Sequence, residues 1–203
     1  MLFNFKKKKF GSVQNVTFFG GAGLIDTNER DGLYEEIVVI AQELAKMGIG
    51  IVNGGGPGVM RASTEGAKKV GGFVTGVTLQ FDDSKPHKFE GRDVLNKFDR
   101  EIKTDNYFDR TRKLLEIGDV HIVVKGATGT FSEFAFAWEI AYLHFGHNKP
   151  LILFGDQWDM LFSAIDKAFD LRKDEFRVYK ILNTPEDVIR YIKELDLQQK
   201  TWI

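Results

Sequence analysis

The 203-residue sequence contains no cysteine, which excludes disulfide bonds, thiolate metal sites and cysteine nucleophiles. It also has almost no net charge, because 28 lysines and arginines face 29 aspartates and glutamates, giving a formal charge of −1. Such a chain has no overall field that would attract nucleic acid or a membrane surface, so we expect neither as a partner. No apolar run approaches the roughly 18 residues of a membrane-spanning helix. These absences predict a cytoplasmic protein.

The sequence also lacks the patterns that mark several common classes of enzyme and cofactor site. The four histidines do not have a metal-ligand spacing, so we expect no bound metal; they are His87, His121, His144 and His147. The Gly-x-Ser-x-Gly nucleophile elbow is absent, and no glycine turn ends in Gly-Lys-Ser/Thr, which disfavours a P-loop ATPase. The turn at Gly20–Gly23 lacks the full dinucleotide fingerprint, which disfavours an NAD-dependent oxidoreductase. We therefore expect no cofactor.

Short apolar runs alternate with amphipathic segments along the chain, which predicts an α/β fold: a doubly wound parallel sheet with helices on both faces. With 43% hydrophobic residues, the chain suffices for one domain over residues 13–203, preceded by a flexible tail at residues 1–12. The expected strands are Asn15–Phe19, Gly50–Val52, Phe73–Val77, His121–Val124, Leu151–Phe154 and, as the weakest pattern, Tyr179–Leu182. The expected helices are Asp31–Met47, Val59–Val70, Asn106–Ile117, Phe131–Phe145, Asp159–Ala168 and Pro185–Leu195. The charged stretch Leu79–Thr104 is typical of a long loop, with room for a short strand.

Three glycine turns each follow an expected strand: Gly20–Gly23, Asn53–Gly58 and Lys125–Thr130. In doubly wound sheets, ligands bind outside the carboxyl ends of the strands. A single turn of this kind is more often just a tight turn, but three at equivalent strand ends favour a ligand site. The third turn also opens a helix, whose first N–H groups attract anions.

Two charged residues are candidates for chemistry. On a helical projection, Arg110 falls on the apolar face of its helix, where it either needs a buried partner or extends its stem along the surface. Glu133 ends the sequence Thr130-Phe131-Ser132-Glu133, which matches a capping box with Thr130 as the N-cap residue. The local pattern therefore favours a capping role for Glu133. Its place beside an anion-binding turn favours contact with a ribose attached to that anion.

The expected helix Phe131–Phe145 is apolar around most of its circumference. Such a helix is covered on every side. Either a second copy of the chain covers one side, which predicts a homodimer, or the helix is central within a single chain.

The sequence Lys125-Gly126-Ala127-Thr128-Gly129-Thr130-Phe131-Ser132-Glu133 resembles the hallmark Pro-Gly-Gly-x-Gly-Thr-x-x-Glu of LOG-type cytokinin riboside 5'-monophosphate phosphoribohydrolases, long mislabelled lysine decarboxylases. The turn Gly54–Met60 is similar to the family's triple-glycine signature, and Arg110 takes the place of its helical arginine. The resemblance covers roughly Val16 to Ala168. It implies a Rossmann-like nucleotide-binding homodimer that hydrolyses the N-glycosidic bond of a nucleoside 5'-monophosphate. Arg110 and Glu133 would be its catalytic pair.

Together, the turns and the resemblance indicate the residues that bind the substrate and its phosphate: Gly20, Gly21, Gly54, Gly55, Gly56, Gly58, Met60, Lys125, Gly126, Ala127, Thr128, Gly129 and Thr130. Lys125 and Ala127 replace the family's proline and second glycine. A methyl group at Ala127 would narrow or distort the pocket if this position required positive φ or a very close approach of the ligand. The alternative function is therefore a non-catalytic binder or carrier of a nucleotide or another phosphorylated ligand. Lysine decarboxylation lacks a recognisable lysine context for pyridoxal phosphate.

Overall fold

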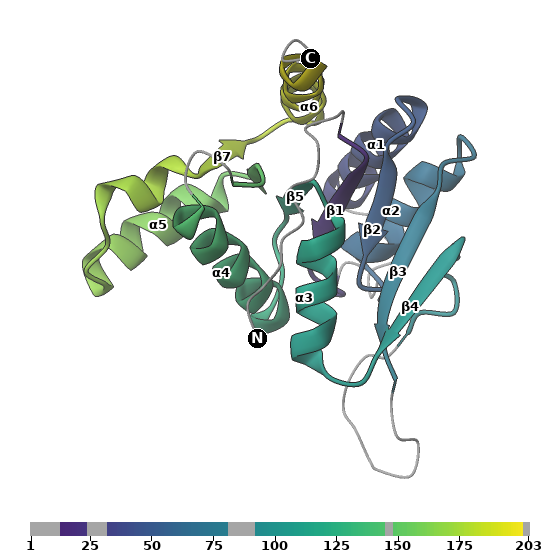
Figure 1. Cartoon of the computed structure of the whole chain (residues 1–203), viewed down its shortest axis with the longest axis horizontal. Coiled ribbons are helices and arrows are strands. Elements are labelled where there is room, and N and C mark those ends of the chain that lie inside the picture. The colour runs from purple at the N-terminus through teal and green to yellow at the C-terminus, as the bar shows by residue number, and fades with distance from the viewer. Residues whose placement is uncertain (1–12, 24–31, 81–91, 145–147, 201–203) are drawn as a thin grey trace.

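The computed structural model describes residues 13–23, 32–80, 92–144 and 148–200, and the predicted tail at residues 1–12 lies outside them. The predicted fold class is confirmed. All seven strands of the described residues form one parallel sheet, in the order β4-β3-β2-β1-β5-β6-β7 (Figure 1).

The strands are β1 (Asn15–Phe19), β2 (Gly50–Asn53), β3 (Val74–Leu79), β4 (Arg100–Thr104), β5 (Val120–Val123), β6 (Leu151–Phe154) and β7 (Tyr179–Leu182). The helices are α1 (Gly32–Lys46), α2 (Val59–Lys68), α3 (Tyr107–Ile117), α4 (Thr128–Leu143), α5 (Gln157–Ala168) and α6 (Pro185–Lys200), with a short 3-10 helix η1 (Lys173–Arg177) before β7.

Strand β4 is the short strand for which the predicted loop at Leu79–Thr104 left room. It lies inside the stretch that the sequence indicates as a long loop, and its residues read Arg-Glu-Ile-Lys-Thr. This strand forms one edge of the sheet and pairs with β3. An edge strand tolerates charged residues because its outer edge faces solvent instead of another strand. β4 therefore lacks the apolar run by which the central strands are predicted from the sequence.

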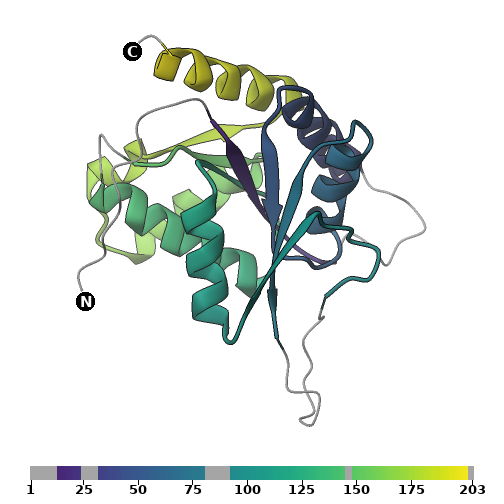
Figure 2. The ribbon, with the colours of Figure 1, turned by 45° about the vertical axis from the view of Figure 1, so that its right-hand side comes forward.

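Helices cover both faces of the sheet (Figures 1 and 2). One apolar core joins α1, α2 and α6 to the sheet, with Phe18 and Ile51 among its fully buried side chains. The second core lies under α3, α4 and α5, where Phe134 stacks on Trp138 and contacts Trp158. Strand β1 contributes Phe18 to the first core and Phe19 to the second, because successive side chains of a strand point to opposite faces.

Helix α4 is not covered on every side by its own chain. Phe134 and Ala137 are buried, whereas four large apolar side chains of α4 are exposed: Phe131, Phe136, Ile140 and Leu143. Of the two alternatives that the sequence leaves open, the one in which a single chain covers this helix on every side is therefore wrong. Phe145 lies outside the described residues. Within the described part of the chain, no helix combines the length and apolar character needed to cross a membrane.

The order in which the chain adds strands reverses between β1 and β5, although all the strands stay parallel. Starting from β1, the chain adds β2, β3 and β4 on one side, then returns through α3 to place β5 on the other side of β1. Open α/β sheets bind ligands at such a switch point, beyond the carboxyl ends of the strands. Two of the three glycine turns follow the two strands that flank this point, and the third follows the neighbouring strand β2.

Candidate functional site

Backbone hydrogen bonds join the three glycine turns. The Gly21 N–H donates to the carbonyl of Lys125 over 3.1 Å, and the Val59 N–H donates to the carbonyl of Gly21, also over 3.1 Å. The turns approach so closely that a Cβ on Gly58 would lie 2.2 Å from the Gly21 oxygen. A Cβ on Gly126 would lie 2.2 Å from the Thr130 Oγ1. Glycine at these positions therefore allows three chain segments to meet at one place.

The turn after β5 leads directly into α4, which begins at Thr128 with Ala127 as its N-cap residue. No side chain caps this end, so the predicted capping box with Thr130 at the N-cap position is wrong. The Phe131 N–H is the first to bond back along the helix, to the carbonyl of Ala127. The N–H groups of Thr128, Gly129 and Thr130 consequently have no partner within the helix. Because residues 125–129 are exposed, an anion has access to this first turn.

Ala127 fits its position without strain. Its φ is −95° and its ψ is −162°, which is extended backbone open to any residue. The position does not require the positive φ that would have made its methyl group a problem. Lys125 is exposed at the start of the same turn, two residues before the N-cap residue of α4.

Arg110 is buried, at 5% exposure, which excludes the alternative that its side chain extends along the surface. Its Nε donates to the carbonyl of Val77 over 3.1 Å, and its Nη2 donates to the carbonyl of Gly54 over 3.0 Å. Its Nη1 donates to the Glu133 Oε1 over 3.0 Å. The Met60 sulfur also lies 3.9 Å from Nη2. The guanidinium is thus fixed between β3, the second glycine turn and α4.

Glu133 is buried beside this guanidinium, with its side chain 8% exposed. Burial disfavours the charged form and raises the pKa of Glu133 to about 7, although the charge and hydrogen bond of Arg110 act in the opposite direction. Arg110 therefore offsets only part of the effect of burial. A carboxyl group with such a pKa changes its charge near neutral pH, as the acid and base groups of enzymes do.

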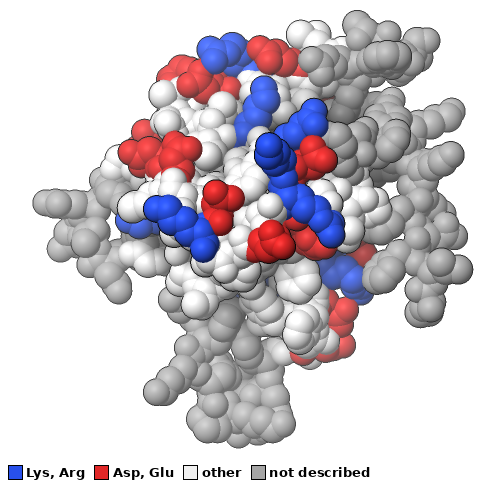
Figure 3. Space-filling view, turned by 90° about the vertical axis from the view of Figure 1, so that its left-hand side faces the viewer, with Lys and Arg blue, Asp and Glu red and all other residues white. Residues whose placement is uncertain are grey.

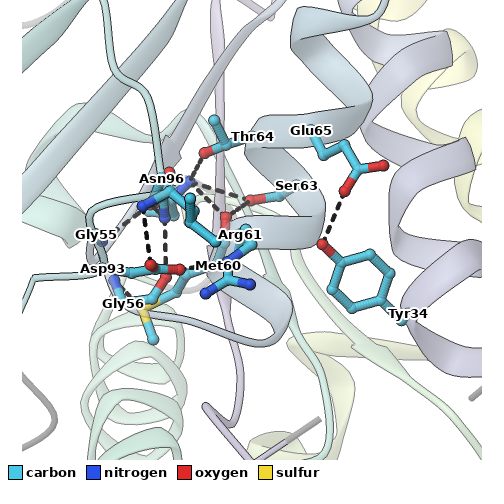
Figure 4. A network of polar contacts seen from close by, with 12 residues as sticks. Tyr34, Gly55, Gly56, Met60, Arg61, Ser63, Thr64, Glu65, Asp93 and Asn96 are labelled. Carbon is cyan, nitrogen blue, oxygen red and sulfur yellow. Dashed lines mark hydrogen bonds and ion pairs between the residues drawn. The ribbon is translucent and has the colours of Figure 1, made fainter. Parts of the chain in front are cut away.

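The second glycine turn has its own polar support, which the sequence did not suggest. Asn53 accepts a hydrogen bond from the Gly55 N–H over 2.9 Å, while its amide nitrogen contacts the Ser63 and Thr64 hydroxyls. From the other side, Asn96 donates to the carbonyl of Gly56 over 2.9 Å (Figure 4). An asparagine just after a strand and before glycines is a recognisable turn former, but Asn96 gives no such signal.

Asp93 adds a charged contact to the same support. Its N–H donates to the carbonyl of Gly55 over 3.0 Å, and its carboxylate forms an ion pair with Arg61 of α2 (Figure 4). Gly55 and Gly58 of this turn have positive φ values, of 77° and 64°. The contacts from both sides therefore hold a backbone shape that glycine adopts at least cost. This shape directs the carbonyl of Gly54 to Arg110.

Gly20 and Gly56 have packing roles at the border of the site. A Cβ on Gly20 would lie 2.6 Å from the side chain of Val59, and one on Gly56 would lie 2.5 Å from the Met60 Cε. Met60 also accepts from the Gly56 N–H at 3.3 Å. The predicted binding residues lie in the three turns or in the first turn of the helix that follows, which is α2 for Met60 and α4 for Thr128 to Thr130. Arg110 and Glu133 occupy the buried side of this region.

Replacing Gly54 with alanine is expected to disturb the Arg110–Glu133 pair. The new Cβ would lie 1.6 Å from the Arg110 Nη2, and the buried guanidinium has little room to move. We expect thermal unfolding to show a loss of about 1–3 kcal/mol in stability, typical of overpacking. Gly23→Ala is the matched control, because a Cβ there meets nothing within 4 Å. Equal stability of the two variants would contradict this account.

Of the four histidines, His121 and His144 are among the described residues, whereas His87 and His147 lie outside them. No group of three or more metal-ligating side chains occurs among the described residues. His121 is buried on β5 beside Phe19, and burial lowers its pKa to about 3, which keeps it neutral. Positive and negative side chains are interspersed on the face seen in Figure 3. Described residues on that face therefore form no broad basic surface.

Comparisons with known proteins identify the family and the fold of this chain. Residues 14–179 match the model of the SLOG cluster4 family. An uncharacterized protein from Archaeoglobus fulgidus is 35% identical over 117 residues, which are 57% of this chain and 71% of that protein.

Solved structures of several other proteins share the fold. The structural-genomics target TM1055 has a TM-score of 0.65 at 24% identity, covering 89% of this chain and 99% of its own. A molybdenum cofactor binding protein from Rippkaea orientalis has a TM-score of 0.63 at 22% identity, with 91% and 97% covered. DNA processing protein A from Helicobacter pylori has a TM-score of 0.59 at 16% identity, with 93% and 84% covered. Relatives this distant establish the fold, while the proteins that share it bind different ligands.

Proposed function

Because this chain belongs to the SLOG cluster4 family and buries an arginine–glutamate pair beside an anion-attracting helix start, we propose that it hydrolyses the N-glycosidic bond of a nucleoside 5'-monophosphate. The products are the free base and ribose 5-phosphate. The observation that carries this proposal is the 3.0 Å contact between the Arg110 Nη1 and the Glu133 Oε1, one helical turn from the first residues of α4.

The phosphate binds at the first turn of α4 in this proposal. The N–H groups of Thr128, Gly129 and Thr130 supply donors there, and Lys125 adds positive charge. A phosphate at this place directs the attached ribose towards Glu133, which follows on the same helix. The exposed turn therefore provides binding, while the buried pair provides chemistry.

The reaction needs a negative charge next to the sugar carbon. As the bond from C1' to the base breaks, C1' gains positive charge, which the Glu133 carboxylate stabilises. The base leaves with the electron pair of the broken bond, water forms the new bond to C1', and the proton that the water loses passes through the Glu133 carboxylate to the departing base. Arg110 orients Glu133 and favours its ionised form.

A panel of nucleoside 5'-monophosphates tests this proposal. Each is incubated with the protein, and the free base is measured by chromatography together with ribose 5-phosphate. Release of one or more bases in equal amounts with ribose 5-phosphate supports hydrolysis. No release from any purine or pyrimidine nucleotide sinks the proposal.

A second candidate function is a non-catalytic binder or carrier of a nucleotide or another phosphorylated ligand. It is favoured by Lys125, which replaces the proline of the hydrolase hallmark and places a charge at the turn. A molybdenum cofactor binding protein of the same fold is consistent with it. Tight binding of a phosphorylated ligand without turnover, measured by calorimetry, distinguishes this function from hydrolysis.

The exposed face of α4 supports a homodimer as part of the proposal. Phe136, Ile140 and Leu143 lie at helical spacing along this face and are 47%, 38% and 64% exposed. A second copy of the chain would cover them. Analytical ultracentrifugation of the wild type and an Ile140→Glu variant tests this, since a dimer that uses the face should dissociate in the variant.

The cytoplasmic location of the protein also stays a prediction.

The hydrolysis rate is expected to rise with pH through about pH 7, because only the ionised form of Glu133 stabilises positive charge on the sugar. The pKa of Glu133 is raised to about 7, so this form is scarce in mildly acidic solution and dominant in mildly alkaline solution. Measuring kcat across this range on the best substrate of the panel checks the prediction. A rate that falls as the pH rises would show that protonated Glu133 is the active form.

A further inference from the structure

We propose that Tyr107, the first residue of α3, is a positioning residue that links the phosphate-binding turn to Arg110. This assignment rests on the proposed function. Tyr107 belongs to neither of the motifs that suggested the site. Its side chain contacts both parts of the site, and the two contacts use different parts of that side chain.

The hydroxyl group contacts the first turns of α4. It donates to the carbonyl of Gly129 over 3.0 Å and lies 3.0 Å from the Ser132 Oγ. Ser132 in turn donates to the same carbonyl over 2.7 Å. These three oxygens form a closed triangle one residue from the buried Glu133. They hold the backbone segment whose N–H groups would bind phosphate.

The ring contacts the arginine. The Arg110 Cζ lies 5.8 Å from the centre of the Tyr107 ring, within the range of a cation–π interaction. The two residues are three apart in α3 and so share one face of the helix. The side chain of Asn106 accepts from the Asp109 N–H over 2.9 Å, which fixes the start of α3 and hence the place of Tyr107.

The environment keeps the hydroxyl protonated. Burial raises the pKa of Tyr107, and the negative charge of Glu133 raises it further. The group therefore stays a hydrogen-bond donor throughout the neutral range. Loss of the hydroxyl group should alter the phosphate-binding turn at the start of α4. Loss of the ring should also remove the cation–π contact with Arg110.

Two substitutions separate these roles. Tyr107→Phe removes only the hydroxyl, so we expect KM to rise about three- to tenfold, as for one lost hydrogen bond, while kcat changes less than about twofold. Tyr107→Leu also removes the ring, and we expect kcat to fall by about tenfold as well. Tyr34→Phe is the matched control, because the Tyr34 hydroxyl donates to Glu65 of α2 (Figure 4). These two residues belong to the helices α1 and α2, which pack in a different core from α3 and α4. Tyr34→Phe should leave both constants unchanged.

Binding of ribose 5-phosphate, measured by calorimetry, tests the role of Tyr107 without any turnover. We expect Tyr107→Phe to weaken this binding about three- to tenfold relative to the wild type. Weaker binding in the variant, together with no hydrolysis by the wild type, would support the role of Tyr107 and overturn the proposed function alone. Unchanged binding and KM in Tyr107→Phe, or no binding of ribose 5-phosphate by the wild type, would overturn the role of Tyr107.

Discussion

Substituting Glu133 with glutamine is expected to lower kcat by about 10²–10⁴-fold, the usual contribution of a positioned acid–base group. Glutamine keeps the shape of the side chain and an oxygen for Arg110, but it provides no negative charge to the sugar and accepts no proton. Because the loss concerns the reaction step, the KM should change much less. Steady-state kinetics with the best nucleotide of the panel measure both constants.

The control for this substitution lies on the same helix. Glu139 is exposed on α4, and Glu139→Gln removes one negative charge without touching the Arg110–Glu133 pair. Its kcat should equal that of the wild type. The pH dependence attributed to Glu133 should also disappear in Glu133→Gln and persist in Glu139→Gln. Full activity of Glu133→Gln would remove the basis of the proposed hydrolysis.

Substituting Arg110 with methionine is expected to produce the largest loss of stability, about 3–5 kcal/mol at mildly alkaline pH, because it leaves a buried carboxylate unpaired. It also leaves the carbonyls of Val77 and Gly54 without their donor. Denaturant unfolding measures the difference in the free energy of unfolding. Hydrolysis should be lost together with stability, since Glu133 is no longer oriented.

The pH dependence of this loss follows from the sign of the pKa shift. Folding raises the pKa of Glu133 from 4.5 to about 7, so the folded state binds more protons between these values and its stability falls as the pH rises. Without Arg110 the folded pKa rises further, and the fall extends to higher pH. In mild acid the difference between Arg110→Met and the wild type should therefore come mainly from the lost bonds to the Val77 and Gly54 carbonyls, and it should widen above about pH 7.

Two further variants keep this prediction testable. Arg112 lies on the same helix but is 46% exposed, in ion pairs with Asp109 and Glu116. Arg112→Met should cost less than about 1 kcal/mol, as exposed ion pairs do. The double substitution Arg110→Met with Glu133→Leu should recover part of the lost stability, since it removes the unpaired charge. A double variant no more stable than Arg110→Met would argue against the unpaired charge as the cause.

The central elements were predictable because their sequences repeat simple patterns. Both β1 and β6 are predicted with their observed bounds. The residues of β6 are all apolar, as in buried strands of a parallel sheet, and those of β1 are mostly apolar or β-branched. The sequence predicts the start of α4 at Phe131, three residues after its observed start at Thr128. The residues Thr130 to Glu133 satisfy the capping-box pattern, yet a buried arginine from another helix engages the glutamate instead. A local pattern contains no information about a partner 23 residues away.

The sequence by itself determined the fold class, the glycine turns and the identity of Arg110 and Glu133 as candidates, because these depend on periodicity and on local motifs. The tertiary structure decided that the two side chains meet in a buried pair and that burial raises the pKa of Glu133 to about 7. It also brought in Tyr107 and Asn96, which belong to no motif. The physical reason is that ion pairing, desolvation and packing depend on which distant segments share a place, and only the folded sheet sets those distances.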